Sequence, residues 1–120
     1  IAAECDGRII GYAYAGVLKD RAAYDHSAET SIYVDVNEKR HGAGKLLYNE
    51  LEKRLVSIGI KNAYACIACP EKDDEYLNHD SIRFHEKLGY KLVGTFHKCA
   101  EKFGRDYDMV WMEKIIGKHD

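Results

Sequence analysis

The sequence predicts an α/β domain: a mixed sheet of about six strands with two helices, in the order β-β-β-α-β-α-β-β. Three observations lead to this prediction. An alternating apolar stretch in the first third runs into a glycine-containing turn and then an amphipathic helix pattern. An Asp-Gly pair near the start separates two apolar runs, and two further strand-like runs close the chain.

The first elements follow from turn and periodicity signals. Residues 1–5 and 8–17 flank Asp6-Gly7, and Asp-Gly between apolar runs is a strong signal for a β-hairpin. The segment 18–27 is polar and predicts a loop. A strand is then expected from Glu29, because apolar and other residues alternate there with period two, the apolar ones being Ile32, Val34 and Val36.

The helix pattern begins at the glycines that follow this strand. Gly42 and Gly44 stand at its start, and Gly59 is placed for a left-handed helix end. Apolar residues recur every three or four positions and predict one buried stripe: Leu47, Leu51, Leu55 and Ile58.

The second half predicts one helix between strands. Residues 62–68 form a short apolar run of the buried-strand type, which Pro70 ends, and the acidic segment 71–75 predicts a solvated loop. A short helix is expected over residues 78–88, with Asn78 or Asp80 as its cap and Gly89 as its stop. Two strands, 90–98 and 107–116, are expected around a loop at 102–105.

Length and charge narrow the class of protein. The 120 residues are enough for a single domain, expected over 1–117, and the chain opens with Ile1 directly in a strand-like run, so a missing N-terminal segment is expected. A net charge of −2 gives no bias toward nucleic acid, and no apolar run has the length of a membrane span. We therefore expect a cytoplasmic protein without nucleic-acid or membrane partners.

Cysteine spacing does not predict a metal site. Cys66 and Cys69 form a C-x-x-C, but it lies inside a strand-like run and has no second pair at ligand spacing. Residues three apart on a strand face opposite sides. We expect buried thiols in a reducing compartment and no metal.

The glycine turn predicts an anion site. Free N–H groups and the positive end of the helix dipole make a helix N-terminus attractive to phosphate, and Lys39, Arg40 and Lys45 add positive charge. A nucleoside-triphosphate loop would need glycine at Lys39 and Ser or Thr at Leu46, and a dinucleotide fingerprint would need a small residue at Leu47. Both of these interpretations fail, whereas a strand-to-helix turn without any ligand stays open.

The turn K-R-H-G-A-G resembles the Q/R-x-x-G-x-G/A pyrophosphate loop of the GNAT superfamily of N-acetyltransferases. Lys39 stands where Gln or Arg is usual, which keeps the charge but loses the planar fork. The likeness extends over nearly the whole chain to the phosphinothricin acetyltransferase group, through the segments RAAYDHSAETSIYV, NHDSIRFHEKLGY, GTFHK and GRDYDMVW. It implies a mostly antiparallel GNAT-like sheet, from which the family's N-terminal strand and two helices are absent here.

The resemblance also implies roles for particular residues. Glu29 matches the general base of the family, and His85 stands where a proton donor to the CoA thiolate is often found, although a structural hydrogen bond would explain His85 equally well. Acetyl-CoA, the implied co-substrate, would contact the strand backbone at Ile32, Tyr33 and Val34, the turn at Lys39, Arg40, His41, Gly42, Ala43 and Gly44, and the polar residues Asn78 and Ser81. Helix capping is a strong alternative for the last two residues, and both roles can coexist.

The acceptor pocket is expected at Arg21, Tyr24, Glu29 and Thr30. An Arg21 guanidinium could hold an amino-acid-like carboxylate or phosphinate. The implied activity is acetyl transfer to the amine of a small substrate of the phosphinothricin or methionine sulfoximine type, in a homodimeric enzyme. Two alternatives remain: a CoA-binding module without turnover, and an acetyltransferase for a protein N-terminus, a polyamine or an aminoglycoside.

Overall fold

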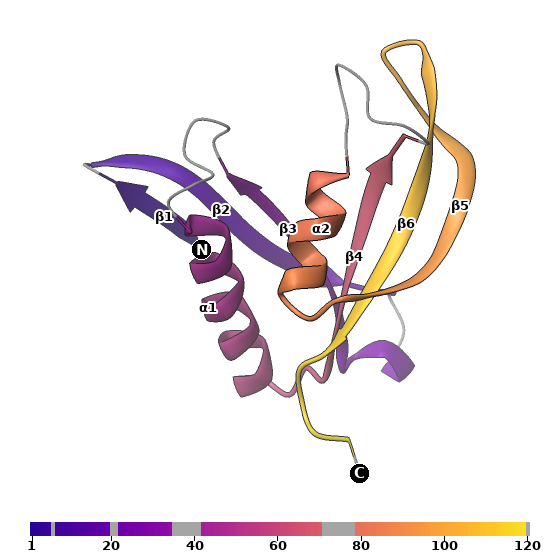
Figure 1. Ribbon diagram of the computed structural model, residues 1–120. Helices are drawn as coiled ribbons and strands as arrows, with labels where there is room; N and C mark the ends of the chain where they lie inside the picture. Colours follow the sequence, from indigo (N-terminus) through magenta and orange to yellow (C-terminus); the bar gives the residue numbers. More distant parts are fainter. Residues whose placement is uncertain (6, 20–21, 35–41, 71–78, 120) are drawn as a thin grey trace. The chain divides into compact units, whose positions relative to one another are not determined.

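The computed structural model describes residues 1–5, 7–19, 22–34, 42–70 and 79–119. These residues form six strands, two α-helices and a short 3-10 helix, and the strands and α-helices follow the predicted order β-β-β-α-β-α-β-β (Figure 1). By its internal contacts the chain divides into two compact units, Ile1–Ala63 with Ile115–Asp120 and Tyr64–Lys114. In the part of the chain described, no helix is long and apolar enough to cross a membrane.

Three antiparallel strands in the order β1-β2-β3 form the sheet of the first unit. They are β1 (Ala2–Cys5), β2 (Arg8–Val17) and β3 (Ser27–Val34). Gly7 has a φ of 77° between β1 and β2, so the predicted hairpin is confirmed, while Asp6 lies outside the described residues. The predicted loop before β3 contains the 3-10 helix η1 (Ala22–Tyr24).

Strand β3 begins two residues before the predicted position. The carbonyl oxygen of His26 accepts the N–H groups of Lys61 at 2.8 Å and Asn62 at 3.2 Å, and these bonds fix the chain just before the strand. Ala28 and Thr30 are buried, with 4% and 2% of their surface exposed, whereas Ile32 is only half-buried. The buried residues of β3 therefore lie mainly near the start of the strand. Val36, which was predicted to continue the strand, lies outside the described residues.

Helix α1 (Ala43–Ser57) begins directly after Gly42, as the glycine turn predicts, and packs on one face of β1, β2 and β3 (Figure 1). Its buried stripe contains Leu47, Leu51 and Leu55. The expected fourth member, Ile58, is 74% exposed, because the helix ends at Ser57 and the chain turns away there. The left-handed end predicted at Gly59 is confirmed by a φ of 93°.

Gly11 of β2 lies close to the backbone of β3. A Cβ atom there would lie 2.7 Å from the carbonyl oxygen of Tyr33 and 3.3 Å from Cδ1 of Leu47. Because real Cβ atoms do not approach backbone oxygen this closely, only glycine lets β2, β3 and α1 meet at this point.

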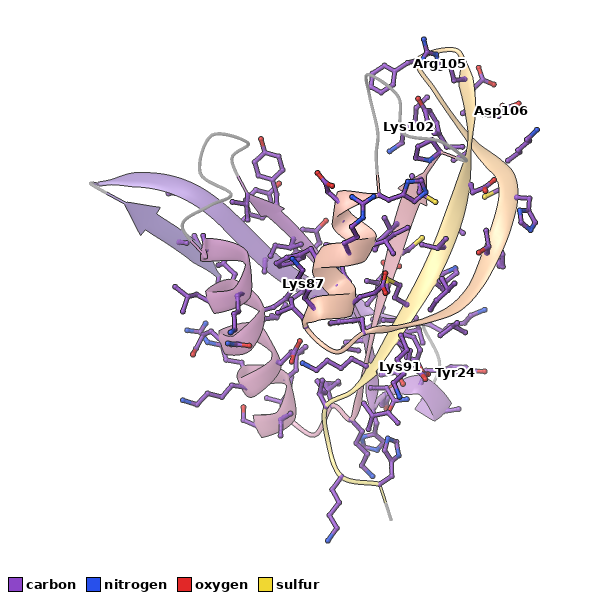
Figure 2. The ribbon with its side chains drawn as sticks, viewed as in Figure 1. Tyr24, Lys87, Lys91, Lys102, Arg105 and Asp106 are labelled. Carbon is purple, nitrogen blue, oxygen red and sulfur yellow. The ribbon has the colours of Figure 1, made fainter. Side chains whose placement is uncertain are left out.

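The second unit holds most of β4 (Asn62–Cys69), together with helix α2 (Asp80–Lys87) and the strands β5 (Lys91–Lys102) and β6 (Arg105–Ile115). These strands have the order β4-β6-β5, and β5 pairs antiparallel with β6. The expected loop at 102–105 is a two-residue turn, because Phe103 and Gly104 both have positive φ and Lys102 pairs with Arg105. Figure 2 shows Lys102, Arg105 and Asp106 at this end of the hairpin.

Two local predictions in the second unit need correction. Asp80 is the first helical residue of α2 and not its cap; the capping position belongs to His79, and Asn78 lies outside the described residues. Of this pair, Cys66 is exposed and Cys69 is buried, because residues three apart on β4 face opposite sides. Burial raises the pKa of the Cys69 thiol. The helix stop predicted at Gly89 is confirmed by a φ of 99°.

Candidate active site

Glu29, the predicted general base, is the third residue of β3 and is half-buried. In the antiparallel register it lies directly opposite Gly16 of β2. Its neighbours Ala28 and Thr30 are buried, and successive side chains of a strand alternate between faces. Glu29 therefore points to the face of the sheet that α1 does not cover.

Thr30, expected in the acceptor pocket, instead joins the buried interface between β3 and α1. Its hydroxyl is hydrogen-bonded to the hydroxyl of Tyr48, and the two residues are 2% and 0% exposed. Burial raises the pKa of Tyr48 to about 12; the bond from Thr30 opposes this rise and the nearby charge of Glu52 adds to it. Tyr48 is thus a neutral hydroxyl at physiological pH, and it ties the helix to the residue beside Glu29.

Three tyrosines lie on the same face of the sheet as Glu29, which is the face that α1 does not cover. Tyr12 pairs with Tyr33 across the strands, and Tyr14 pairs with Ser31. The rings of Tyr12 and Tyr33 are stacked at a centroid distance of 5.5 Å, and those of Tyr12 and Tyr14 at 6.2 Å. This face was not predicted from the sequence, although the alternation of small and aromatic residues in G-Y-A-Y-A-G was a usable signal.

The glycine turn has the features of a phosphate site. Gly42 has a φ of 72°, is exposed and offers no side-chain cap, and no acidic residue stands in the first turn of α1. Among the described residues, no atom lies within 4 Å of where a Cβ atom on Gly42 would stand, so these residues leave space beside the helix N-terminus. These features fit a diphosphate that approaches the backbone N–H groups. Lys39, Arg40 and His41 lie outside the described residues.

His85 of α2 is held inside the second unit and is 3% exposed. Its Nδ1–H donates to the carbonyl oxygen of Ser81 at 2.7 Å, and Tyr90 packs edge-on against its ring at 5.2 Å. Burial lowers the pKa of His85, and the bond to Ser81 opposes this shift only partly. The neutral ring then has its proton on Nδ1, so only the disfavoured imidazolium could donate a proton from Nε2.

The structure describes some of the other predicted site residues, and these are divided between the two units. Ile32, Tyr33 and Val34 continue β3 beyond Glu29, and Ala43 and Gly44 are buried at the start of α1. Tyr24 is exposed on η1 (Figure 2), and Ser81 is exposed on α2. Arg21 and Asn78 lie outside the described residues. The first unit therefore contains the candidate base, the strand backbone and the glycine turn, and the second unit contains Ser81 and His85.

Comparison with known proteins identifies one family. The sequence model described as an acetyltransferase (GNAT) domain matches residues 1–111. A phosphinothricin N-acetyltransferase of Streptomyces viridochromogenes is 36% identical over 114 residues, which are 95% of this chain and 58% of that protein. An L-methionine sulfoximine/L-methionine sulfone acetyltransferase of Pseudomonas paraeruginosa is 28% identical, over 94% of this chain and 62% of its own length.

The fold is shared with a solved structure of the same kind. A GNAT superfamily phosphinothricin acetyltransferase from Sinorhizobium meliloti, in complex with acetyl-CoA, superposes with a TM-score of 0.81 and is 31% identical. The match covers 97% of this chain and 60% of that one. The chain therefore spans less than two thirds of the length of these relatives.

We predict that an added Cβ at Gly42 weakens acetyl-CoA binding. Asn tolerates a positive φ and should keep the turn, whereas Val should also strain it. Gly42→Asn should lower the affinity roughly tenfold, equivalent to about one lost backbone hydrogen bond, in isothermal titration calorimetry. Gly104→Asn is the matched control, since Gly104 has the same φ of 72° and equally open surroundings. Equal affinities of the two Asn variants would exclude the turn as the binding site.

We predict that His85 makes stability depend on pH. The histidine side chain of the unfolded chain has its ordinary pKa of about 6.5, so below this pH it binds a proton that the buried ring of the folded protein does not bind. The free energy of unfolding therefore falls as pH falls. The slope of the free energy of unfolding against pH is at most about 1.4 kcal/mol per pH unit. It ends where the pH falls below the lowered pKa that His85 has in the folded protein. Urea denaturation between pH 7.5 and 5 should show this slope in the native protein but not in His85→Asn. Parallel pH profiles would mean that His85 titrates normally in the folded protein.

Proposed function

The chain belongs to the GNAT acetyltransferase family, and we propose that it transfers the acetyl group of acetyl-CoA to the amine of a small amino-acid-like acceptor. Acceptors of the phosphinothricin or methionine sulfoximine type fit the activities for which two of its relatives are named. One structural observation carries the proposal. The same strand that leads toward the glycine turn places a carboxylate, Glu29, on the face left open by α1.

Glu29 acts as the general base in this proposal. An amino-acid ammonium group must lose a proton before its nitrogen can attack, and a positioned carboxylate can accept that proton directly or through one water. Transfer then forms a C–N bond, breaks the C–S bond of the thioester and releases CoA as its thiolate. The half-buried position of Glu29 leaves its carboxylate accessible, while the adjacent buried Thr30 holds the strand beneath it.

The first unit would position acetyl-CoA through its backbone. We propose that the N–H groups at the start of α1 receive the diphosphate and that the β3 backbone from Ile32 to Val34 faces the thioester. Lys39, Arg40 and His41 would add charge and contacts at the same turn. Asn78 and Ser81 would contact the pantetheine arm, and Arg21 and Tyr24 the acceptor.

Proton donation to the CoA thiolate by His85 stays a prediction. Its Nδ1–H is already engaged with the carbonyl oxygen of Ser81, and burial disfavours the imidazolium that would have to donate. These contacts favour the structural role. Location in the cytoplasm, assembly as a homodimer and the absence of metal also stay predictions.

The alternatives give different results in one assay. A CoA-binding module would bind acetyl-CoA without releasing CoA thiol in the presence of any amine. An enzyme for a protein N-terminus, a polyamine or an aminoglycoside would release thiol with those acceptors and not with amino-acid analogues. We expect thiol release with L-phosphinothricin or L-methionine sulfoximine, confirmed by mass spectrometry of the acetylated product.

With a confirmed acceptor, Glu29→Gln should lower kcat roughly 100- to 10,000-fold, because the variant keeps the shape but loses the proton acceptor. The affinity for acetyl-CoA should stay unchanged. The ascending limb of the pH–rate profile should be lost or displaced, and a second acceptor of different amine pKa separates this limb from the acceptor's own ionisation.

Glu50→Gln is the matched control for Glu29→Gln. Glu50 is an exposed carboxylate on α1 and accepts a hydrogen bond from Nε of Arg54 at 3.1 Å, a kind of pair that contributes little to stability. Its loss should leave kcat unchanged. Near-native kcat in Glu29→Gln would show that Glu29 is structural and that another base, or an already neutral amine, serves the reaction.

A further inference from the structure

Two glycines of β2 have opposite surroundings. Gly11 is required by packing, as described above, because a Cβ there would collide with the backbone of β3. A Cβ on Gly16 would meet no atom of the described residues within 4 Å, and Gly16 does not have the positive φ that favours glycine. Neither the backbone nor the packing of the described residues therefore explains the missing side chain at position 16.

The space above Gly16 borders directly on the candidate base. Gly16 and Glu29 are cross-strand partners, and partners in an antiparallel pair point to the same face with Cβ positions about 5 Å apart. The carboxylate of Glu29 thus stands beside a position from which no side chain projects. An atom that occupies this position can lie within hydrogen-bonding reach of the carboxylate.

A tyrosine is the next residue along β2 on this face of the sheet. Tyr14 lies two residues from Gly16 on the same face and is 56% exposed. Its stacking on Tyr12, at an angle of 22° between the ring planes, limits its orientation. Diagonal neighbours on a sheet are about 7 to 8 Å apart, a distance that an aromatic side chain can span.

The chemistry of these groups selects a cation. The face of a tyrosine ring attracts an ammonium group, and a carboxylate attracts it more strongly. Resting on the function proposed above, we propose that the space above Gly16, between Glu29 and Tyr14, receives the ammonium group of the acceptor. The space left by the missing side chain at position 16 then determines how large a group the acceptor can carry next to its amine.

Side chains of increasing size at position 16 test this proposal. Gly16→Ala and Gly16→Val should raise the KM for L-phosphinothricin progressively, by roughly tenfold or more for Val, with a smaller change in kcat. Acetyl-CoA affinity and the thermal unfolding midpoint should stay unchanged, because a Cβ atom at position 16 meets no atom of the described residues within 4 Å. Gly94→Val is the matched control, since Gly94 is also a strand glycine with open surroundings and without positive φ.

A binding measurement keeps this test separate from that of the proposed function. Calorimetry should detect L-phosphinothricin binding to the CoA-saturated native protein and a loss of affinity in Gly16→Val. This result without any turnover would contradict the proposed enzyme and still support the subsite. Absence of binding to the native protein, or equal affinities in the native protein, Gly16→Val and Gly94→Val, would overturn the subsite.

Discussion

The two-residue period of β3 is the constraint on which the candidate site depends. Thr30 is buried beneath α1 and hydrogen-bonded to Tyr48, so the neighbouring Glu29 must point to the opposite face. A slip of one residue would bury the carboxylate under the helix and expose the threonine. The hydrogen bond between Thr30 and Tyr48 therefore helps to fix the register of the strand as well as the position of the helix on it.

The proposed sites for two ligands lie on one short segment of this unit. Gly42 lets the chain turn sharply into α1 with a positive φ, and the helix N-terminus then presents backbone N–H groups that no side chain of the described residues blocks at Gly42. Because α1 packs on β3 and its Tyr48 is hydrogen-bonded to Thr30, Gly42 and the strand belong to the same compact unit. The proposed phosphate site and the proposed base therefore come from one strand, one turn and one helix.

The local patterns of the sequence predicted this unit well. The alternation around Glu29 and the spacing of Leu47, Leu51 and Leu55 are properties of single elements, and the structure confirms the helix and the strand that they predict. Features that depend on pairing between elements escaped prediction. The tyrosine face and the partnership of Gly16 with Glu29 require the register of β2 against β3, and the exposure of Cys66 requires knowing which face of β4 is covered.

The central claim is that the acceptor amine attacks the thioester directly, with Glu29 as base and no covalent intermediate on the protein. Intact-protein mass spectrometry after incubation with acetyl-CoA alone tests this most directly, combined with initial rates at varied concentrations of both substrates. Direct transfer predicts a protein of unchanged mass and intersecting double-reciprocal lines. An acetylated protein that passes its acetyl group to a later-added amine, with parallel lines, would contradict the account.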